Sequence, residues 1–157
     1  MDLATFNESP DGAATGLLLS CCASRRFAAA VARGRPYPSL AAVNAAADAA
    51  FKELTWDDVS EAVAAHPRIG ARATGQSAAE QSGVRPSDRA ALAAANAEYE
   101  ARFGHAFLIC ATGLSGTDML AALKSRLANN PYTERALVTQ ELRKITADRV
   151  RKALDAA

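Results

Sequence analysis

Alanine supplies much of the apolar content of this chain, in which half of the residues are hydrophobic and only 6% are aromatic. Alanine is the strongest helix former, whereas strands are enriched in β-branched and aromatic residues. The chain has 157 residues, which is enough to bury a core and is the size of one ordinary domain. The composition therefore predicts an all-α fold, with residues 1–157 forming a single compact helical bundle.

N-cap residues and helical spacing divide the chain into about seven or eight helices, with no convincing sheet. Ser24, Ser39, Thr55 and Ser87 stand where side-chain caps are expected, and Asn130-Pro131 opens the last helix. After a short N-terminal turn, the expected helices cover about residues 10–22, 24–33, 39–54, 55–66, a short stretch from 77, 87–103, 117–128 and 130–154.

Phe107-Leu108-Ile109-Cys110-Ala111 is a short apolar run bounded by glycines. A strand would show this pattern, but no second strand is evident that could pair with it. We interpret the run as a buried extended connector. Its backbone N–H and C=O groups must then find partners elsewhere in the fold.

The charge balance and the cysteines limit the partners and the compartment. Lysine and arginine number 18 against 17 acidic residues, whereas a nucleic-acid binder normally carries a basic face. Three cysteines without a C-x-x-C spacing predict neither a disulfide framework nor a zinc site, and they favour a reducing compartment. No apolar run approaches the roughly 20 residues that cross a bilayer. The apolar stretch 16–22 follows only acidic charges, unlike a signal peptide. We expect a cytoplasmic protein that binds neither nucleic acid nor membranes.

His66 is one of two histidines, and it stands at the end of an expected helix. Val59 and Val63 precede it at helical spacing, so His66 is the next residue on their apolar face. Pro67 restricts His66 to extended geometry, and Gly70 lets the chain turn. Histidine titrates near neutral pH, and this fixed, inward-facing position suits a proton-transfer group. The alternative is a core histidine that bonds a free helix carbonyl.

Glu80 follows His66 by only fourteen residues, across one expected loop. Ser77-Ala78-Ala79-Glu80 has the spacing of a capping box, in which the glutamate bonds back to the serine N–H. Such a box would explain Glu80 without any function. A carboxylate beside an imidazole would instead fix the tautomer of the ring and raise its pKa. The spacing allows both interpretations.

Arg149 carries a charge on the apolar face of the last helix. Val138, Leu142, Ile145 and Arg149 recur at the spacing of a core-facing stripe. An unpaired guanidinium in such a position is costly, so it should meet an anion. The anion could be a ligand, for which the arginine fork is suited. It could also be an internal carboxylate, or the long stem could carry the charge out to water.

Four short motifs occur in a fixed order: His66-Pro67-Arg68-Ile69-Gly70, Ser77-x-x-Glu80-Gln81, Asn96-x-x-Tyr99-x-x-x-Phe103-Gly104-x-x-Phe107 and Glu141-x-x-Lys144-Ile145-x-x-x-Arg149. The series resembles the 2-oxo-4-hydroxy-4-carboxy-5-ureidoimidazoline (OHCU) decarboxylases of purine catabolism. The segment Cys21-Cys22-x-Ser24-x-Arg26-Phe27 also resembles the first helices of that family, so the resemblance spans nearly the whole chain.

The resemblance implies an all-helical single domain, often a homodimer, that uses no cofactor and no metal. The implied substrate is the ureidoimidazoline formed by urate oxidation and hydrolysis, and the implied products are (S)-allantoin and carbon dioxide. His66 matches the catalytic histidine of the family. The family's substrate-binding residues match Pro67, Ser77, Glu80, Gln81, Arg149 and the backbone of Phe107, Leu108, Ile109, Cys110 and Ala111.

We therefore expect a cofactor-independent decarboxylase in which His66, Glu80 and Arg149 carry the reaction. Loss of carbon dioxide leaves electrons in the imidazoline ring, and His66 would protonate the ureido-bearing carbon from one face. Glu80 would hold the substrate hydroxyl, Arg149 the carboxylate, and Gln81 would help to orient the ring. A non-catalytic helical interaction module is the alternative, and it would scatter these residues instead of gathering them at one cavity. A related ureido compound is a further candidate substrate.

Overall fold

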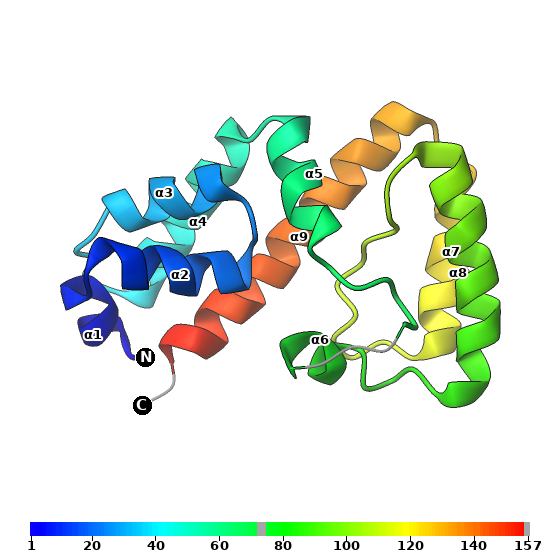
Figure 1. The fold of residues 1–157 in the computed structure, drawn as a ribbon, viewed down its shortest axis with the longest axis horizontal. Helices are drawn as coiled ribbons and strands as arrows, with labels where there is room; N and C mark the ends of the chain where they lie inside the picture. The colour runs from blue at the N-terminus through cyan, green and yellow to red at the C-terminus, as the bar shows by residue number, and fades with distance from the viewer. Residues whose placement is uncertain (72–74, 156–157) are drawn as a thin grey trace. The chain divides into compact units, whose positions relative to one another are not determined.

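The structure is a computed structural model that describes residues 1–71 and 75–155. Within these residues the secondary structure is helical and contains no strand, which confirms the all-α prediction (Figure 1). The helices are α1 (Leu3–Glu8), α2 (Asp11–Cys21), α3 (Arg25–Arg33), α4 (Leu40–Glu53), α5 (Trp56–Ala64), α6 (Gly75–Glu80), the 3₁₀ helix η1 (Pro86–Asp88), α7 (Arg89–Phe103), α8 (Gly116–Arg126) and α9 (Pro131–Leu154).

The helices fall into two compact units. Unit one comprises Met1–Ala62 and the chain from Arg143 onward, and unit two comprises Val63–Leu142. The assignment of residues 1–157 to a single domain stays a prediction. Among the described residues, no helix is both long enough and apolar enough to span a bilayer.

Unit one is built on α3, which packs against both α2 and α4. The rings of Phe27 and Phe51 lie 5.2 Å apart, and both side chains are buried. Serine caps begin two of these helices as the sequence predicts. Ser24 Oγ accepts from the Phe27 N–H at 3.3 Å, and Ser39 Oγ accepts from the Ala42 N–H at 3.1 Å. Polar caps and buried apolar faces thus account for the local structure of this unit.

Unit two is organised around α7, which packs against α8. Tyr99 of α7 is fully buried, and its ring meets the Phe107 ring edge-on at a centroid distance of 5.3 Å. The core cluster also includes residues from the loop after α5, from α7, from the run 107–111 and from α8, namely Ile69, Leu92, Ala95, Ile109, Ala111, Met119 and Leu123. The loop after His66 and the run Phe107–Ala111 therefore share one hydrophobic core.

The run Phe107–Ala111 is extended and pairs with no strand among the described residues. All of its side chains except Cys110 are buried. Two of its backbone groups bond to side chains instead of to a sheet. Arg126 Nη1 donates to the Leu108 carbonyl at 2.6 Å, and the Cys110 N–H donates to Glu141 Oε1 at 3.4 Å. The prediction of a buried extended connector is confirmed.

Two boundaries differ from the sequence-based expectation. The predicted N-terminal turn is a helix, because Asp2 Oδ1 accepts from the Thr5 N–H at 2.8 Å and caps α1. Ser87 does not cap a long helix, because it lies inside η1. Pro86 starts that 3₁₀ turn with a fixed φ, and Asp88 closes it by accepting from the Arg85 N–H at 3.0 Å.

Candidate active site

His66 lies just beyond the end of α5 and is partly buried. Val59 and Val63 on the preceding helical face are buried, as the spacing predicts. The His66 N–H donates to the Val63 carbonyl at 3.0 Å, which joins the start of the following loop to the last turn of α5. Pro67 follows and removes one backbone donor. The backbone that carries the imidazole is therefore held from the helix side.

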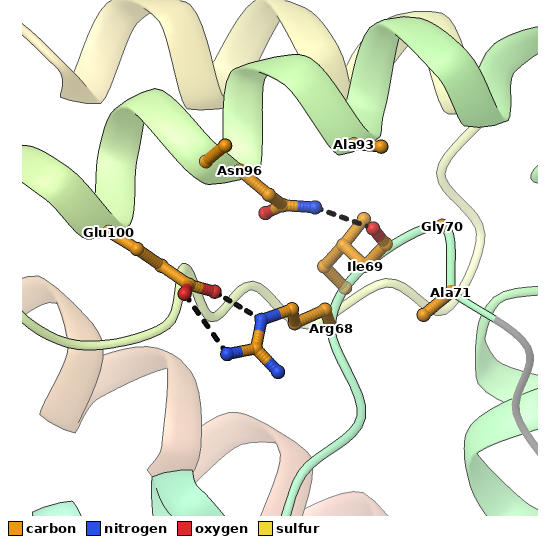
Figure 2. Close-up of a pocket in the computed structure, with 8 residues that line it drawn as sticks. Arg68, Ile69, Gly70, Ala71, Ala93, Asn96 and Glu100 are labelled. Atoms are coloured by element: carbon orange, nitrogen blue, oxygen red, sulfur yellow. Dashed lines mark hydrogen bonds and ion pairs between the residues drawn. The ribbon is translucent and has the colours of Figure 1, made fainter.

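The same loop is held at its other end through one peptide unit. Asn96 Nδ2 of α7 donates to the Ile69 carbonyl at 2.7 Å (Figure 2). The next N–H along the chain, that of Gly70, donates to Gln81 Oε1 at 2.9 Å. Both polar groups of the Ile69–Gly70 peptide thus bond to carboxamide side chains.

Gly70 is required by the geometry of this turn. Its φ is +84°, in the left-handed region that residues other than glycine rarely adopt. A Cβ at this position would lie 3.0 Å from two side-chain atoms of Leu92. The loop after His66 therefore packs directly against α7.

Two cavities border Gly70 and Ala71 in unit two. One has a volume of about 230 Å³ and lies between the loop and α7, where Figure 2 shows the Arg68 guanidinium turned toward the Glu100 carboxylate. The other has a volume of about 200 Å³, and Gln81 and Arg89 are among the residues that line it. The loop after His66 thus borders open space on two sides. Convergence of His66, Glu80 and Arg149 on one cavity stays a prediction.

Glu80 is the last residue of α6 and is partly buried. The capping-box interpretation of Ser77 and Glu80 is wrong, because α6 begins at Gly75 and Ser77 is already inside the helix. A residue with helical neighbours on both sides is not an N-cap. Gln81 follows Glu80 directly, so its bond to Gly70 ties the end of α6 to the loop after His66.

A buried charge pair supports the extended run. Arg126 of α8 donates from Nε to Glu134 Oε1 at 2.5 Å, while its Nη1 holds the Leu108 carbonyl. The guanidinium also lies over the Phe107 ring, 4.6 Å from the ring centroid. Glu134 has no exposed surface, and it also accepts from the Tyr99 hydroxyl at 2.6 Å. This network fixes a main-chain carbonyl in the middle of the run.

Tyr99 is held neutral in this network. Burial raises the pKa of Tyr99 well above its usual value, and the hydrogen bond to Glu134 adds to the effect. The hydroxyl therefore remains protonated at neutral pH and donates to Glu134. It serves the network as a structural group.

Arg149 belongs to unit one and is 8% exposed. Such burial disfavours the interpretation in which its stem carries the charge out to water. Burial raises the pKa of the Cys21 and Cys22 thiols, and the positive charge of Arg149 offsets part of that rise. Arg149 therefore lies close to both thiols inside unit one. Its role in holding an anionic ligand stays a prediction.

Three residues that the structure makes prominent received no role from the sequence: Asn96, which was named only as part of a motif, Arg126 and Glu134. A signal for all three was present. Glu134 precedes Val138 by one helical turn, and Asn96 follows Leu92 by one turn, so both fall on buried stripes. The argument that singled out Arg149 applies equally to these polar residues. Arg126 also falls on such a stripe, because it follows the buried residues Met119 and Leu123 by seven and three positions.

Comparisons with known proteins agree with this architecture. The sequence matches the model of the OHCU decarboxylase family over residues 7–151. It is 35% identical over 144 residues to the uric acid degradation bifunctional protein TTL of Arabidopsis thaliana. The matched region covers 84% of this chain and 44% of that protein. It is 31% identical over 129 residues to a 2-oxo-4-hydroxy-4-carboxy-5-ureidoimidazoline decarboxylase of Amia calva, covering 75% of this chain and 74% of the relative.

Solved structures give the same result. A crystal structure of an OHCU decarboxylase in the presence of (S)-allantoin has a TM-score of 0.81 and 31% identity, covering 94% of this chain and 99% of that one. A crystal structure of (S)-allantoin synthase has a TM-score of 0.74 at 18% identity, covering 99% of this chain and 55% of that one, and shows the fold alone. The matches place the chain among the helical decarboxylases of urate degradation. It belongs to the OHCU decarboxylase family.

Proposed function

We propose that this chain decarboxylates 2-oxo-4-hydroxy-4-carboxy-5-ureidoimidazoline to (S)-allantoin and carbon dioxide in urate degradation. The observation that carries the proposal is the family match over residues 7–151. The chain spans 44% of the length of the Arabidopsis relative, so the proposal concerns decarboxylation and not the second activity of that bifunctional protein. The reaction needs no cofactor, because the electron pair left by carbon dioxide is accepted by the imidazoline ring.

His66 is the proposed proton donor. Cleavage of the bond to the carboxylate releases carbon dioxide and leaves an enol-like ring. A proton must then reach the ureido-bearing carbon from one face to give a single enantiomer. An imidazole held from the α5 side and from the Ile69–Gly70 side has a restricted approach to that carbon.

Residues in and near α6 are proposed to bind the substrate ring and its hydroxyl group. Glu80 would accept from the substrate hydroxyl, and Ser77 and Pro67 would line the ring. Gln81 Oε1 already accepts from the Gly70 N–H, so this side chain has its N–H groups left to offer. These N–H groups would donate to a ring carbonyl oxygen.

The backbone of Phe107, Leu108, Ile109, Cys110 and Ala111 is proposed to supply further contacts to the planar ring. Main-chain N–H and C=O groups match the alternating donors and acceptors of a ureido compound. Arg149 is proposed to bind the substrate carboxylate, which its guanidinium can hold through two parallel N–H bonds. The positive charge of Arg149 would also stabilise the transition state, because negative charge remains on the ring after carbon dioxide leaves.

The proposal is tested by adding the purified chain to freshly generated substrate and following the circular dichroism of the allantoin formed. We expect rapid appearance of the (S)-enantiomer signal. Formation of allantoin no faster than without protein, and without optical activity, would overturn the proposal and favour the interaction module. Turnover of a related ureido compound at higher efficiency would reassign the substrate.

A homodimer and a cytoplasmic location complete the proposal. The resemblance to the family supports the dimer, and light scattering after gel filtration measures it directly. None of the three cysteines forms a disulfide, which supports a reducing compartment. Localisation of the tagged chain in its own cells would test this assignment.

A further inference from the structure

Asn96 is a buried polar residue to which the proposed reaction gives no role. It lies in the middle of α7, it is 3% exposed, and its Nδ2 holds the Ile69 carbonyl. Its Oδ1 is buried and has no hydrogen-bond partner among the described residues. A buried acceptor without a partner lowers stability, so an apolar side chain would pack this face of α7 better. Folding alone therefore gives a poor reason for asparagine here.

The hydrogen bond from Asn96 is made to the Ile69–Gly70 peptide, whose N–H group is already bound by Gln81. The Ile69 carbonyl and the Gly70 N–H belong to one planar unit, and Gln81 holds the N–H. Rotation of that plane would break both hydrogen bonds at once.

This peptide is coupled to His66 by a short and stiff connection. Only Pro67 and Arg68 lie between His66 and Ile69, and proline fixes its own φ and restricts the residue before it. The Ala71 N–H donates to the Arg68 carbonyl at 3.0 Å, which closes the turn around the Ile69–Gly70 peptide. A shift of the Ile69–Gly70 peptide would therefore move the backbone of His66.

We propose that Asn96 is a positioning residue for the decarboxylase reaction. By holding the Ile69 carbonyl it fixes the His66–Gly70 segment, so that the imidazole delivers its proton to one face of the substrate. The inference rests on the proposed function of His66. Because a displacement of about 1 Å can cost roughly 10²-fold in rate, loss of this bond should lower kcat about 10- to 100-fold. KM should change by less than about threefold, because Asn96 acts through His66.

Glu100 provides a matched control on the same helix. It follows Asn96 by four residues, so the two side chains lie on one face of α7, as Figure 2 shows. Glu100 pairs with the guanidinium of Arg68, in the same loop that Asn96 holds. The Arg68 side chain is largely exposed, so this ion pair should contribute little. Glu100→Gln should leave kcat within about twofold of the original.

Asn96→Asp is the decisive variant, because it keeps the shape and removes the donor. At neutral pH a carboxylate would face the Ile69 carbonyl and repel it. A protonated carboxyl group can donate to that carbonyl, so the ratio of variant to original kcat should rise as the pH falls. A residue needed only for packing would show no such rescue. Asn96→Ser keeps a shorter donor and serves if the aspartate variant does not fold.

The enantiomeric purity of the product is the second measurement. With enough enzyme for the catalysed rate to far exceed spontaneous decay, the original chain and Glu100→Gln should give (S)-allantoin alone. Asn96→Asp should give allantoin of lower enantiomeric excess, because a displaced imidazole allows protonation from either face. Unchanged kcat and unchanged enantiomeric excess in both Asn96 variants would overturn the proposal.

A measurement without substrate separates this inference from the proposed function. The chain has two histidines, His66 and His105, so the imidazole NMR signals can be assigned with His66→Ala. Asn96→Asp should shift the His66 signals, and Glu100→Gln should leave them unchanged. Inactivity of the original chain together with shifted His66 signals would reject the reaction and retain the positional coupling. An active original chain with unmoved His66 signals in Asn96→Asp would reject the coupling alone.

Discussion

Glu134 holds Arg126 in the interior of unit two, with Glu134 Oε1 2.5 Å from Arg126 Nε and no exposed surface on the glutamate. The pair does more than neutralise two charges. Arg126 uses Nη1 to hold the Leu108 carbonyl, and Asn129 Nδ2 donates to Glu134 Oε2 at 3.1 Å. The ion pair between α8 and α9 thereby fixes the Leu108 carbonyl in the extended run.

Glu134→Gln should strongly destabilise the protein. It leaves the buried Arg126 charge without its counter-charge, and breaking a buried pair from one side costs about 3–5 kcal/mol. In a protein of this size the Tm should fall by about 6–20 °C in differential scanning calorimetry. Glu61→Gln is the control, because its partner Arg25 is 86% exposed in the side chain and the change should be small. Equal losses in the two variants would contradict the importance of burial.

His66→Ala should fold normally and lose most activity. General acid–base groups contribute about 10²–10⁴-fold to rate, equivalent to roughly 3–5 kcal/mol of barrier. Single-turnover rates and thermal melting, measured on the same preparation, check this. Turnover close to the original value at unchanged Tm would remove His66 from the reaction.

Glu80→Gln should lower turnover strongly and barely change the Tm. Glu80 ends α6, and Ser77 lies within that helix, so no capping box is lost in the variant. Glutamine keeps the size of the side chain but not its negative charge, which the substrate hydroxyl is proposed to meet. Stopped-flow measurement of kcat beside a melting curve tests both halves of the expectation. A large drop in Tm with normal kcat would point to a structural role.

Arg149→Lys should reduce kcat/KM about 10- to 150-fold. Lysine keeps the charge but loses the two parallel N–H bonds of the guanidinium, and charge-assisted hydrogen bonds are worth roughly 1.5–3 kcal/mol. Folding should survive, because a cation still occupies a site that is 8% exposed. Unchanged efficiency would exclude Arg149 from substrate binding. A collapse of stability without substrate would identify an internal ion pair instead.

Cys21 and Cys22 should resist alkylation in the folded protein. Burial raises the pKa of both thiols above the usual value of 9.0, so little thiolate is present at pH 8. Iodoacetamide labelling followed by peptide mass spectrometry should be at least about tenfold slower than in urea. The rate should increase with pH, because higher pH forms the reactive thiolate. Fast labelling at pH 8 would show that these side chains are accessible.

Local signals in the sequence predicted most of the helical structure. Ser24 and Ser39 cap helices by bonding to amides three residues away, and such interactions depend only on neighbouring residues. The buried extended run was predictable for a similar reason, since five apolar residues between glycines cannot form a long helix. The start of α6 at Gly75 was missed, because the spacing of Ser77 and Glu80 favours Ser77 as the cap, although the sequence also offers Thr74, a residue type that caps helices, directly before Gly75.

The contacts that build the site could not be predicted in the same way. Asn96 reaches Ile69 across 27 residues, and Gln81 reaches Gly70 across 11. Neither pairing has a periodic signature, because each depends on how the loop after α5 is laid against α7. Spacing alone singled out His66, Glu80 and Arg149, and the family resemblance supplied the other candidate site residues. The hydrogen bonds that hold the loop became visible only with the fold.

The extended run from Phe107 to Ala111 has one more consequence. Its buried side chains face the core, so apart from the Cys110 side chain the run can offer a ligand only its peptide groups, and these are the same for every amino acid except proline. A scan of single alanine substitutions would therefore underrate this part of the site, since alanine keeps each N–H and C=O. Substitutions along the run would be restricted by side-chain packing in the core and not by contacts with a ligand. If the run binds substrate as proposed, different side chains that pack equally well here would leave the same peptide groups in place.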